Sequence, residues 1–138
     1  MAYNQIYRNG ICEGVAYSGS LHNDADLIPS RTVAIFFREF IEKFTDFLKD
    51  QGIGGAAIVG GALLRTEGSR FASGSAWGGM ETADRNHLIF PEMLIESLSD
   101  FNDVDAVANP ILDVMWQAFG HDLCYDYGNS GVWLPQRL

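Results

Sequence analysis

Long hydrophobic runs are missing from this sequence. No apolar stretch approaches the roughly 18 residues that a membrane-spanning helix requires. Residues 1–10 are polar and lack the apolar core of a secretory signal peptide. The two cysteines, Cys12 and Cys124, stand near opposite ends of the chain, which is not the pattern of a disulfide framework. We therefore expect a soluble, reduced, cytoplasmic protein that does not contact a membrane.

Basic side chains are also scarce, and those present are scattered. The chain has 9 Lys and Arg residues against 18 Asp and Glu, and its formal net charge is −9. Binding to a nucleic-acid duplex requires clustered basic side chains that displace counterions, and no three basic residues are consecutive here. We therefore expect no direct nucleic-acid binding and no attraction to an anionic membrane surface. The acidity is explained either by ordinary solubility or by a basic protein partner.

Catalytic and metal-binding motifs are missing as well. The three histidines form no H-E-x-x-H motif, and no Cys or His pair has metal-ligand spacing. No serine lies in G-x-S-x-G, and a G-x-G-x-x-A match at residues 52–57 ends a predicted helix instead of opening one. A site built from His121, Asp122 and Cys124 requires the backbone to curl around one ion. We expect no metal, no cofactor and no catalytic residue, so an enzyme is the less favoured interpretation.

Acidic residues cluster before the second predicted helix, at Asp100, Asp103 and Asp105. They do not complete an EF-hand loop, because Val104 occupies the third ligand position. Negative side chains at a helix N-terminus cap its free N–H groups and complement its dipole, which is the role we expect here. Whether two of these carboxylates pair for acid–base chemistry is left open, because such pairing depends on the tertiary structure.

Apolar residues at helical spacing predict two amphipathic helices. The first begins with Ser30 in the N-cap position, carries a Phe-rich stripe and ends at Gly52. The second spans residues 104–119, where Pro110 either kinks the helix or marks its true start. With 47% apolar residues and nine Phe, the chain has enough material for one core, so we expect a single domain over residues 1–138.

Alternating apolar residues predict the strands. Residues 11–17 alternate, and the Asn9-Gly10 turn joins them to a lead-in strand in a hairpin. Residues 18–29 read as a loop. Further strands are expected at residues 56–65, 70–77 and 86–90, the first two joined as a hairpin. The predicted fold is α+β, with a largely antiparallel sheet on which one long amphipathic helix and a second, C-terminal helix pack.

Tryptophan and histidine supply the candidate binding residues. Trp77, at a strand end, and Trp133, in the C-terminal tail, are candidates to anchor a protein contact, because interfaces favour tryptophan. Partial burial over the small-residue hairpin is the favoured explanation for both. His22 and His87 are candidates to line a small-molecule pocket between the hairpin near Trp77 and the loop at residues 18–26.

Two stretches carry a family resemblance: DRNHLIFPEMLIE at residues 84–96 and NPILDVMWQAFG at residues 109–120. With YDYG at residues 125–128 and Trp133, they resemble the C-terminal region of bacterial proteins that carry an N-terminal AlbA/Schlafen-type domain, to which DNA binding is attributed. The resemblance covers most of the chain from about Ile11 onward, and that N-terminal domain has no counterpart here. It implies an accessory domain that mediates assembly or regulates a partner domain, and it transfers no catalytic or binding residue.

Three functions follow as hypotheses. The leading one is a non-catalytic accessory domain that acts through protein–protein contacts or oligomerisation, either as a homodimer or docked on a basic domain. The second is a small-molecule-binding or hydrolytic domain. The third is an acidic inhibitor or immunity-type protein, which the net charge of −9 suits.

Overall fold

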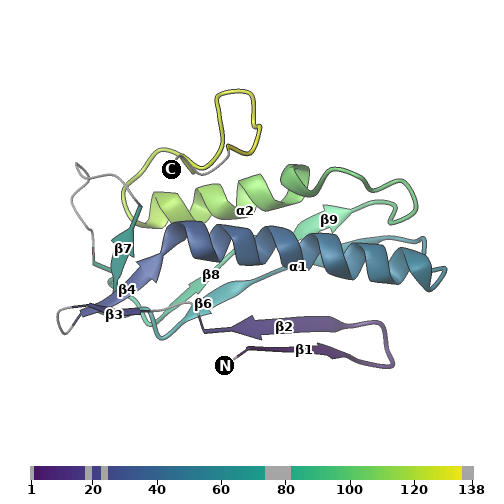
Figure 1. Cartoon of the computed structure of the whole chain (residues 1–138), viewed down its shortest axis with the longest axis horizontal. Coiled ribbons are helices and arrows are strands. Elements are labelled where there is room, and N and C mark those ends of the chain that lie inside the picture. Colours follow the sequence, from purple (N-terminus) through teal and green to yellow (C-terminus); the bar gives the residue numbers. More distant parts are fainter. Residues whose placement is uncertain (1, 18–19, 23–24, 74–81, 135–138) are drawn as a thin grey trace.

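A computed structural model of the chain describes residues 2–17, 20–22, 25–73 and 82–134, with backbone only for residues 20–22, 25 and 26 (Figure 1). The elements run in the order β1 (Ala2–Ile6), β2 (Cys12–Ala16), β3 (Ser20–His22), β4 (Ala25–Pro29), α1 (Ser30–Asp50), β5 (Ala57–Val59), β6 (Ala62–Leu64), β7 (Arg70–Ala72), β8 (His87–Ile89), β9 (Met93–Ile95) and α2 (Val104–Ala118). The predicted α+β class is confirmed, because the long helix and the C-terminal helix pack together and the described strand pairs are antiparallel except β4–β7. No helix in this described part is long and apolar enough to cross a membrane.

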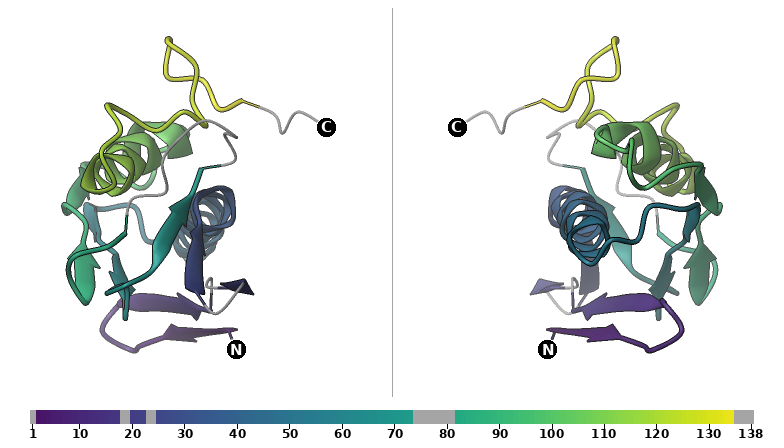
Figure 2. Two further views of the ribbon diagram at one scale, coloured as in Figure 1. Left: turned by 90° about the vertical axis from the view of Figure 1, so that its left-hand side faces the viewer. Right: turned by 90° about the vertical axis from the view of Figure 1, so that its right-hand side faces the viewer.

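Helix α1 lies in the middle of the fold, with the β1–β2 hairpin on one side and α2 on another (Figure 2). The predicted Phe-rich stripe is confirmed in part: Val33, Phe37 and Ile41 are buried, but Phe40 and Phe44 are half-buried and Phe47 is exposed. The predicted Ser30 N-cap is wrong. Pro29 takes the N-cap position, and the Ser30 hydroxyl donates instead to the Ala72 carbonyl at 2.8 Å. The first turn of α1 is therefore tied to β7.

The predicted stops and caps of the helices are otherwise confirmed. Gly52 follows α1 with a φ of +77°, a left-handed conformation that glycine adopts without steric cost. Asp103 caps α2, because its side chain accepts a hydrogen bond from the Ala106 N–H at 3.2 Å. Pro110 lies inside α2 and does not mark its start. The buried face of α2, from Val107 through Trp116, forms much of the core.

Strands β5 and β6 pair with β9 and β8, respectively, and together they form one long antiparallel ribbon. Gly60 and Gly61 stand opposite three residues, 90–92, so the ladder is interrupted by a bulge. Pro91 falls at this interruption because it has no N–H to donate to the ladder. The N–H of Phe90 donates to the Gly61 carbonyl at 2.9 Å, which holds the two halves of the ribbon in register.

Two strand predictions are wrong. The small-residue strand does not form a hairpin with β7, the described part of the strand predicted at residues 70–77, because β6 pairs with β8 and β7 pairs in parallel with β4. Residues 74–77 lie outside the described residues. The turn that was expected to close that hairpin bonds elsewhere: the Thr66 N–H donates to the Asn86 carbonyl at 3.0 Å. Residues 18–29 also contain β3 and β4, where a loop was expected. Phe71 of β7 is buried in the core, which favours the pairing found.

Candidate functional site

The thiols and acidic side chains form no obvious reactive centre. Across residues 2–17, 25–73 and 82–134, no group of three or more His, Cys, Asp or Glu side chains is placed to hold a metal ion. Cys124 is fully buried, its N–H donates to Asp113 Oδ1 at 2.8 Å, and burial raises the pKa of its thiol to about 12. Burial also raises the pKa of the Cys12 thiol. Because a nucleophilic cysteine needs a depressed pKa, neither thiol is prepared for attack.

One side of the ribbon is apolar and uncovered. We call it the outer face and define it by the exposed residues Ile58, Ala62, Leu64, His87, Ile89 and Leu94. The large apolar members are 68% (Ile58), 68% (Leu64), 76% (Ile89) and 60% (Leu94) exposed. The alternate side chains point the other way, and Leu88 and Ile95 are buried in the core.

The members of the outer face lie directly beside one another across the ribbon. Ile58 is paired with Leu94, and Leu64 is paired with His87. Contiguous exposed apolar surface on a soluble domain marks an interaction site more often than an accident of packing. The two ends of this face differ in charge. Exposed Glu96 stands at the β5–β9 end of the ribbon and exposed Arg65 and Arg85 at the β6–β8 end, whereas exposed Glu92 lies between them at the bulge, beside Gly60.

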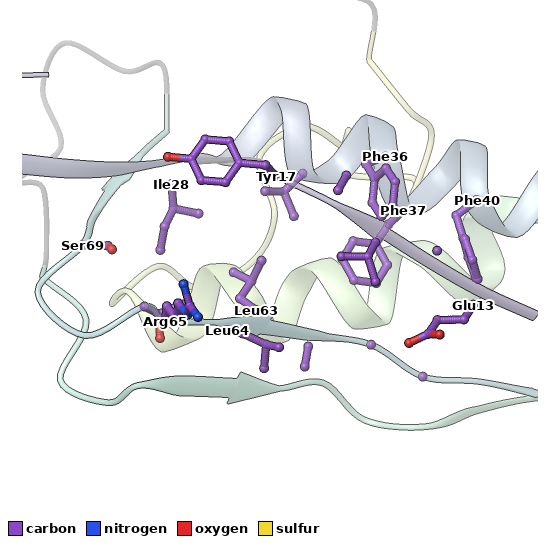
Figure 3. A pocket seen from close by; sticks show the side chains of 18 of the residues that line it. Glu13, Tyr17, Ile28, Phe36, Phe37, Phe40, Leu63, Leu64, Arg65 and Ser69 are labelled. Atoms are coloured by element: carbon purple, nitrogen blue, oxygen red, sulfur yellow. The ribbon is translucent and has the colours of Figure 1, made fainter. Parts of the chain in front are cut away.

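A cavity of about 620 Å³ lies between β2, α1 and β6 (Figure 3). Its apolar wall comes from α1, chiefly Val33, Phe36, Phe37 and Phe40, and its two sides are residues 12–17 and residues 60–66. We call it the groove. Its volume falls within the range of ligand-binding pockets, roughly 300–1,000 Å³.

Glycines set how closely the two sides of the groove approach α1. A Cβ at Gly14 would stand 2.6 Å from the ring of Phe40, and a Cβ at Gly61 would overlap the ring of Phe37. Each strand therefore crosses directly over an aromatic ring of the helix, and the space between the two crossings is left open.

The polar groups of the groove are few. Glu13 lies at one end and Arg65 at the other (Figure 3). The Tyr7 hydroxyl donates to Glu13 Oε2 at 3.0 Å, and this hydrogen bond raises the pKa of Tyr7. Thr66 also lines the groove, but its hydroxyl donates to the Arg85 carbonyl at 2.6 Å. The groove thus offers apolar surface, strand backbone and one charge of each sign.

The ring of Trp133 packs against two arginine side chains of the same chain. The guanidinium groups of Arg31 and Arg38 lie 4.0 and 4.3 Å from the centroid of its ring. Arg38 also donates two hydrogen bonds to Asp105, at 2.7 and 3.1 Å, and the Tyr127 hydroxyl donates to the same carboxylate at 2.8 Å. We call this set the C-terminal clasp, since it joins α1, the first turn of α2 and the C-terminal segment.

The contacts in the clasp shift the pKa values of Asp105 and Tyr127. Burial opposes ionisation of Asp105, but the hydrogen bonds from Arg38 and Tyr127 outweigh it, so the pKa of Asp105 lies below its usual value. Burial, followed by the hydrogen bond to Asp105, raises the pKa of Tyr127. These shifts are those of a structural ion pair between packed elements.

The four candidate binding residues fall in different places. His87 is exposed on the outer face, and Trp133 belongs to the clasp. The backbone of His22 lies in β3, while its side chain and all of Trp77 lie outside the described residues. The apolar members of the outer face and the aromatic wall of the groove were not among the candidates. In the sequence they are indistinguishable from core residues.

Comparison with protein-family models, curated proteins and solved structures finds no match for this chain.

Proposed function

We propose that this chain is a non-catalytic interaction domain that self-associates through the outer face of its ribbon. The observation that carries the proposal is the row of four large apolar side chains, 60–76% exposed, on one side of β5, β6, β8 and β9. This role agrees with the accessory function that the AlbA/Schlafen-type resemblance implies. Of the net charge of −9, one carboxylate, that of Glu92, lies near the middle of the ribbon at the bulge.

The occupant we favour is a second copy of the chain. When two outer faces meet with their ribbons running in opposite directions, the acidic end of one copy lies against the basic end of the other. Glu96 then approaches Arg65 and Arg85 of the second copy, and the same contacts repeat by two-fold symmetry. The two ends of the face are therefore complementary in charge.

The expected affinity follows from the buried surface. Burying one such side chain fully contributes roughly 1.5–3 kcal/mol, so eight of them, about two-thirds exposed, contribute about 8–16 kcal/mol. Lost translational and rotational freedom costs roughly 4–15 kcal/mol. The balance therefore ranges from no association to about 12 kcal/mol in favour of the dimer, and a micromolar dissociation constant, which requires about 8 kcal/mol, lies within this range.

The test is the solution mass, measured by light scattering during size-exclusion chromatography at several protein concentrations. We expect the wild type to shift from monomer to dimer across the micromolar range, and Ile58→Glu to remain a monomer because it places a carboxylate inside the interface. Val132→Glu is the matched control, since Val132 is 60% exposed but lies in the C-terminal segment. A wild type that is monomeric at every concentration, or an Ile58→Glu variant that dimerises normally, contradicts the proposal.

The relative direction of the two ribbons is tested by charge exchange. Glu96→Arg should weaken the dimer because it brings like charges together, and adding Arg85→Glu should restore it. If the double variant is no stronger than the single one, the opposed arrangement is wrong.

A further inference from the structure

The groove is flanked by two strand edges that have no partner within the described chain. There, β2 pairs only with β1, and β6 pairs only with β8. On an edge strand, every second residue directs its N–H and C=O away from the existing partner. Both edges, residues 12–17 and residues 60–66, line the same cavity. Backbone donors and acceptors therefore face this space from two sides.

The size of the groove matches a short strand. From a rise of about 3.3 Å, a strand spacing of about 4.8 Å and a layer separation of about 10 Å, one strand residue in a sheet occupies roughly 160 Å³. The cavity of about 620 Å³ therefore accommodates about four residues. The side chains of α1 that close it, Phe36, Phe37 and Phe40, supply the apolar surface on which one face of such a strand would pack.

We propose that the groove is a strand acceptor: it binds an extended polypeptide segment of about four residues from a partner protein, inserted between β2 and β6. Alternate side chains of the segment are apolar and face α1, and its backbone bonds to both edges. Its flanks carry opposite charges, a cation toward Glu13 and a carboxylate toward Arg65, because these residues mark the two ends of the groove (Figure 3). The segment completes a sheet across α1, and its site shares Ala62, Leu64 and Arg65 with the end of the ribbon used for self-association.

A strand acceptor fits the groove better than a small-molecule site does. A small-molecule pocket orients its ligand with several converging polar side chains. Here the Thr66 hydroxyl is already bonded to the Arg85 carbonyl, and Glu13 accepts from Tyr7. The polar surface left is the strand backbone together with the hydroxyl groups of Tyr17 and Ser69, which also line the groove. An inserted strand would also pair with both edges, which as unpaired edge strands could otherwise pair with strands of other protein molecules.

The test uses a synthetic peptide, fluorescein-labelled Lys-Val-Thr-Val-Thr-Glu-amide, with binding followed by fluorescence anisotropy. Two further peptides carry N-methyl groups on alternate residues, one on the odd positions and one on the even positions. A strand held between two edges uses both sets of backbone N–H groups, so each methylated peptide should bind at least tenfold more weakly. If only one set matters, the peptide adds to a single edge and the two-edge proposal is overturned. Equal binding of all three peptides, or no binding of the parent peptide, also overturns it.

Blocking the groove tests whether the peptide binds there. Cys12 lines the groove, so alkylating it with N-phenylmaleimide should reduce peptide binding at least tenfold. The matched control is the double variant Cys12→Ser/Asn129→Cys, alkylated at position 129, an exposed position of the C-terminal segment. This control should bind as the unmodified protein does. Peptide binding that survives alkylation of Cys12 places the site elsewhere and overturns the proposal, whatever the oligomeric state proves to be.

Discussion

Removing the charge of Asp105 tests whether the C-terminal clasp stabilises the fold through an ion pair. The carboxylate of Asp105 accepts two hydrogen bonds from Arg38 and one from the buried Tyr127. In Asp105→Asn the shape is kept, but the amide nitrogen presents its hydrogens to a guanidinium that can only donate. The change therefore removes one charge and at least one charge-assisted hydrogen bond.

The magnitude follows from the partial burial of the pair. The side chains of Arg38 and Asp105 are 27% and 26% exposed, which places the pair between a surface and a buried salt bridge. A hydrogen bond to a charged group contributes roughly 1.5–3 kcal/mol, whereas a fully exposed pair contributes roughly 0–1 kcal/mol. We expect Asp105→Asn to lower the free energy of unfolding by about 1–3 kcal/mol at pH 7. Asp46→Asn, at an exposed carboxylate of α1, should change it by less than about 0.5 kcal/mol.

The pH dependence gives the sharper check. Because the pKa of Asp105 is lower in the folded protein than its ordinary value of 3.8, the ionised form stabilises the fold. This contribution is present above about pH 4 and is lost as the pH falls through the folded pKa. The difference between wild type and Asp105→Asn, measured by urea unfolding at one fixed protein concentration, should therefore shrink between pH 5 and about pH 3. A difference that persists undiminished at low pH, or is absent at pH 7, refutes the ion-pair explanation.

Two further predictions concern packing and thiol accessibility. Gly61→Ala should lower the free energy of unfolding, measured in urea, by about 1–3 kcal/mol, because the added methyl group overlaps the ring of Phe37. Gly60→Ala adds only an ordinary contact and should lower it by less than about 1 kcal/mol. Equal decreases for the two variants would contradict the close crossing over α1. In the native protein at pH 8, a thiol reagent such as 5,5′-dithiobis(2-nitrobenzoic acid) should react with one cysteine, the partly exposed Cys12. Cys124 should react only after unfolding, because it is fully buried and its thiol has a pKa of about 12. Two rapidly reacting thiols in the native protein would show that Cys124 is accessible.

The local features of this fold were predictable from the sequence. Apolar residues at helical spacing identify α1, because a helix buries one stripe whatever it packs against. The Asn9-Gly10 turn identifies the β1–β2 hairpin, and Gly10 has the expected positive φ of +88°. Asp103 was expected to contribute to capping because caps depend on residues three or four positions away. Each of these signals lies within a few residues of the structure that it predicts.

The choice of strand partners could not be read in this way. Strand β6 pairs with β8 across an intervening segment that contains β7, and β7 pairs with β4, which lies before α1. Such pairings depend on how several elements bury their apolar faces together. A turn sequence like that at residues 66–69 does not determine whether the strands beside it pair with each other, because its backbone bonds equally well to a third segment.

The candidate sites were decided by the tertiary structure alone. Trp133 was a candidate contact residue with partial burial as the favoured alternative, and only the tertiary structure shows that Arg31 and Arg38, far away in the sequence, lie over its ring. Ile58 and Leu94 look like core residues in the sequence, because an apolar side chain in a strand carries no mark of the face on which it lies. Composition and periodicity determine that this chain has helices, strands and a core, since those depend on local spacing. Which apolar surfaces stay uncovered depends on how α1 and α2 pack on one side of the ribbon and leave the other side open.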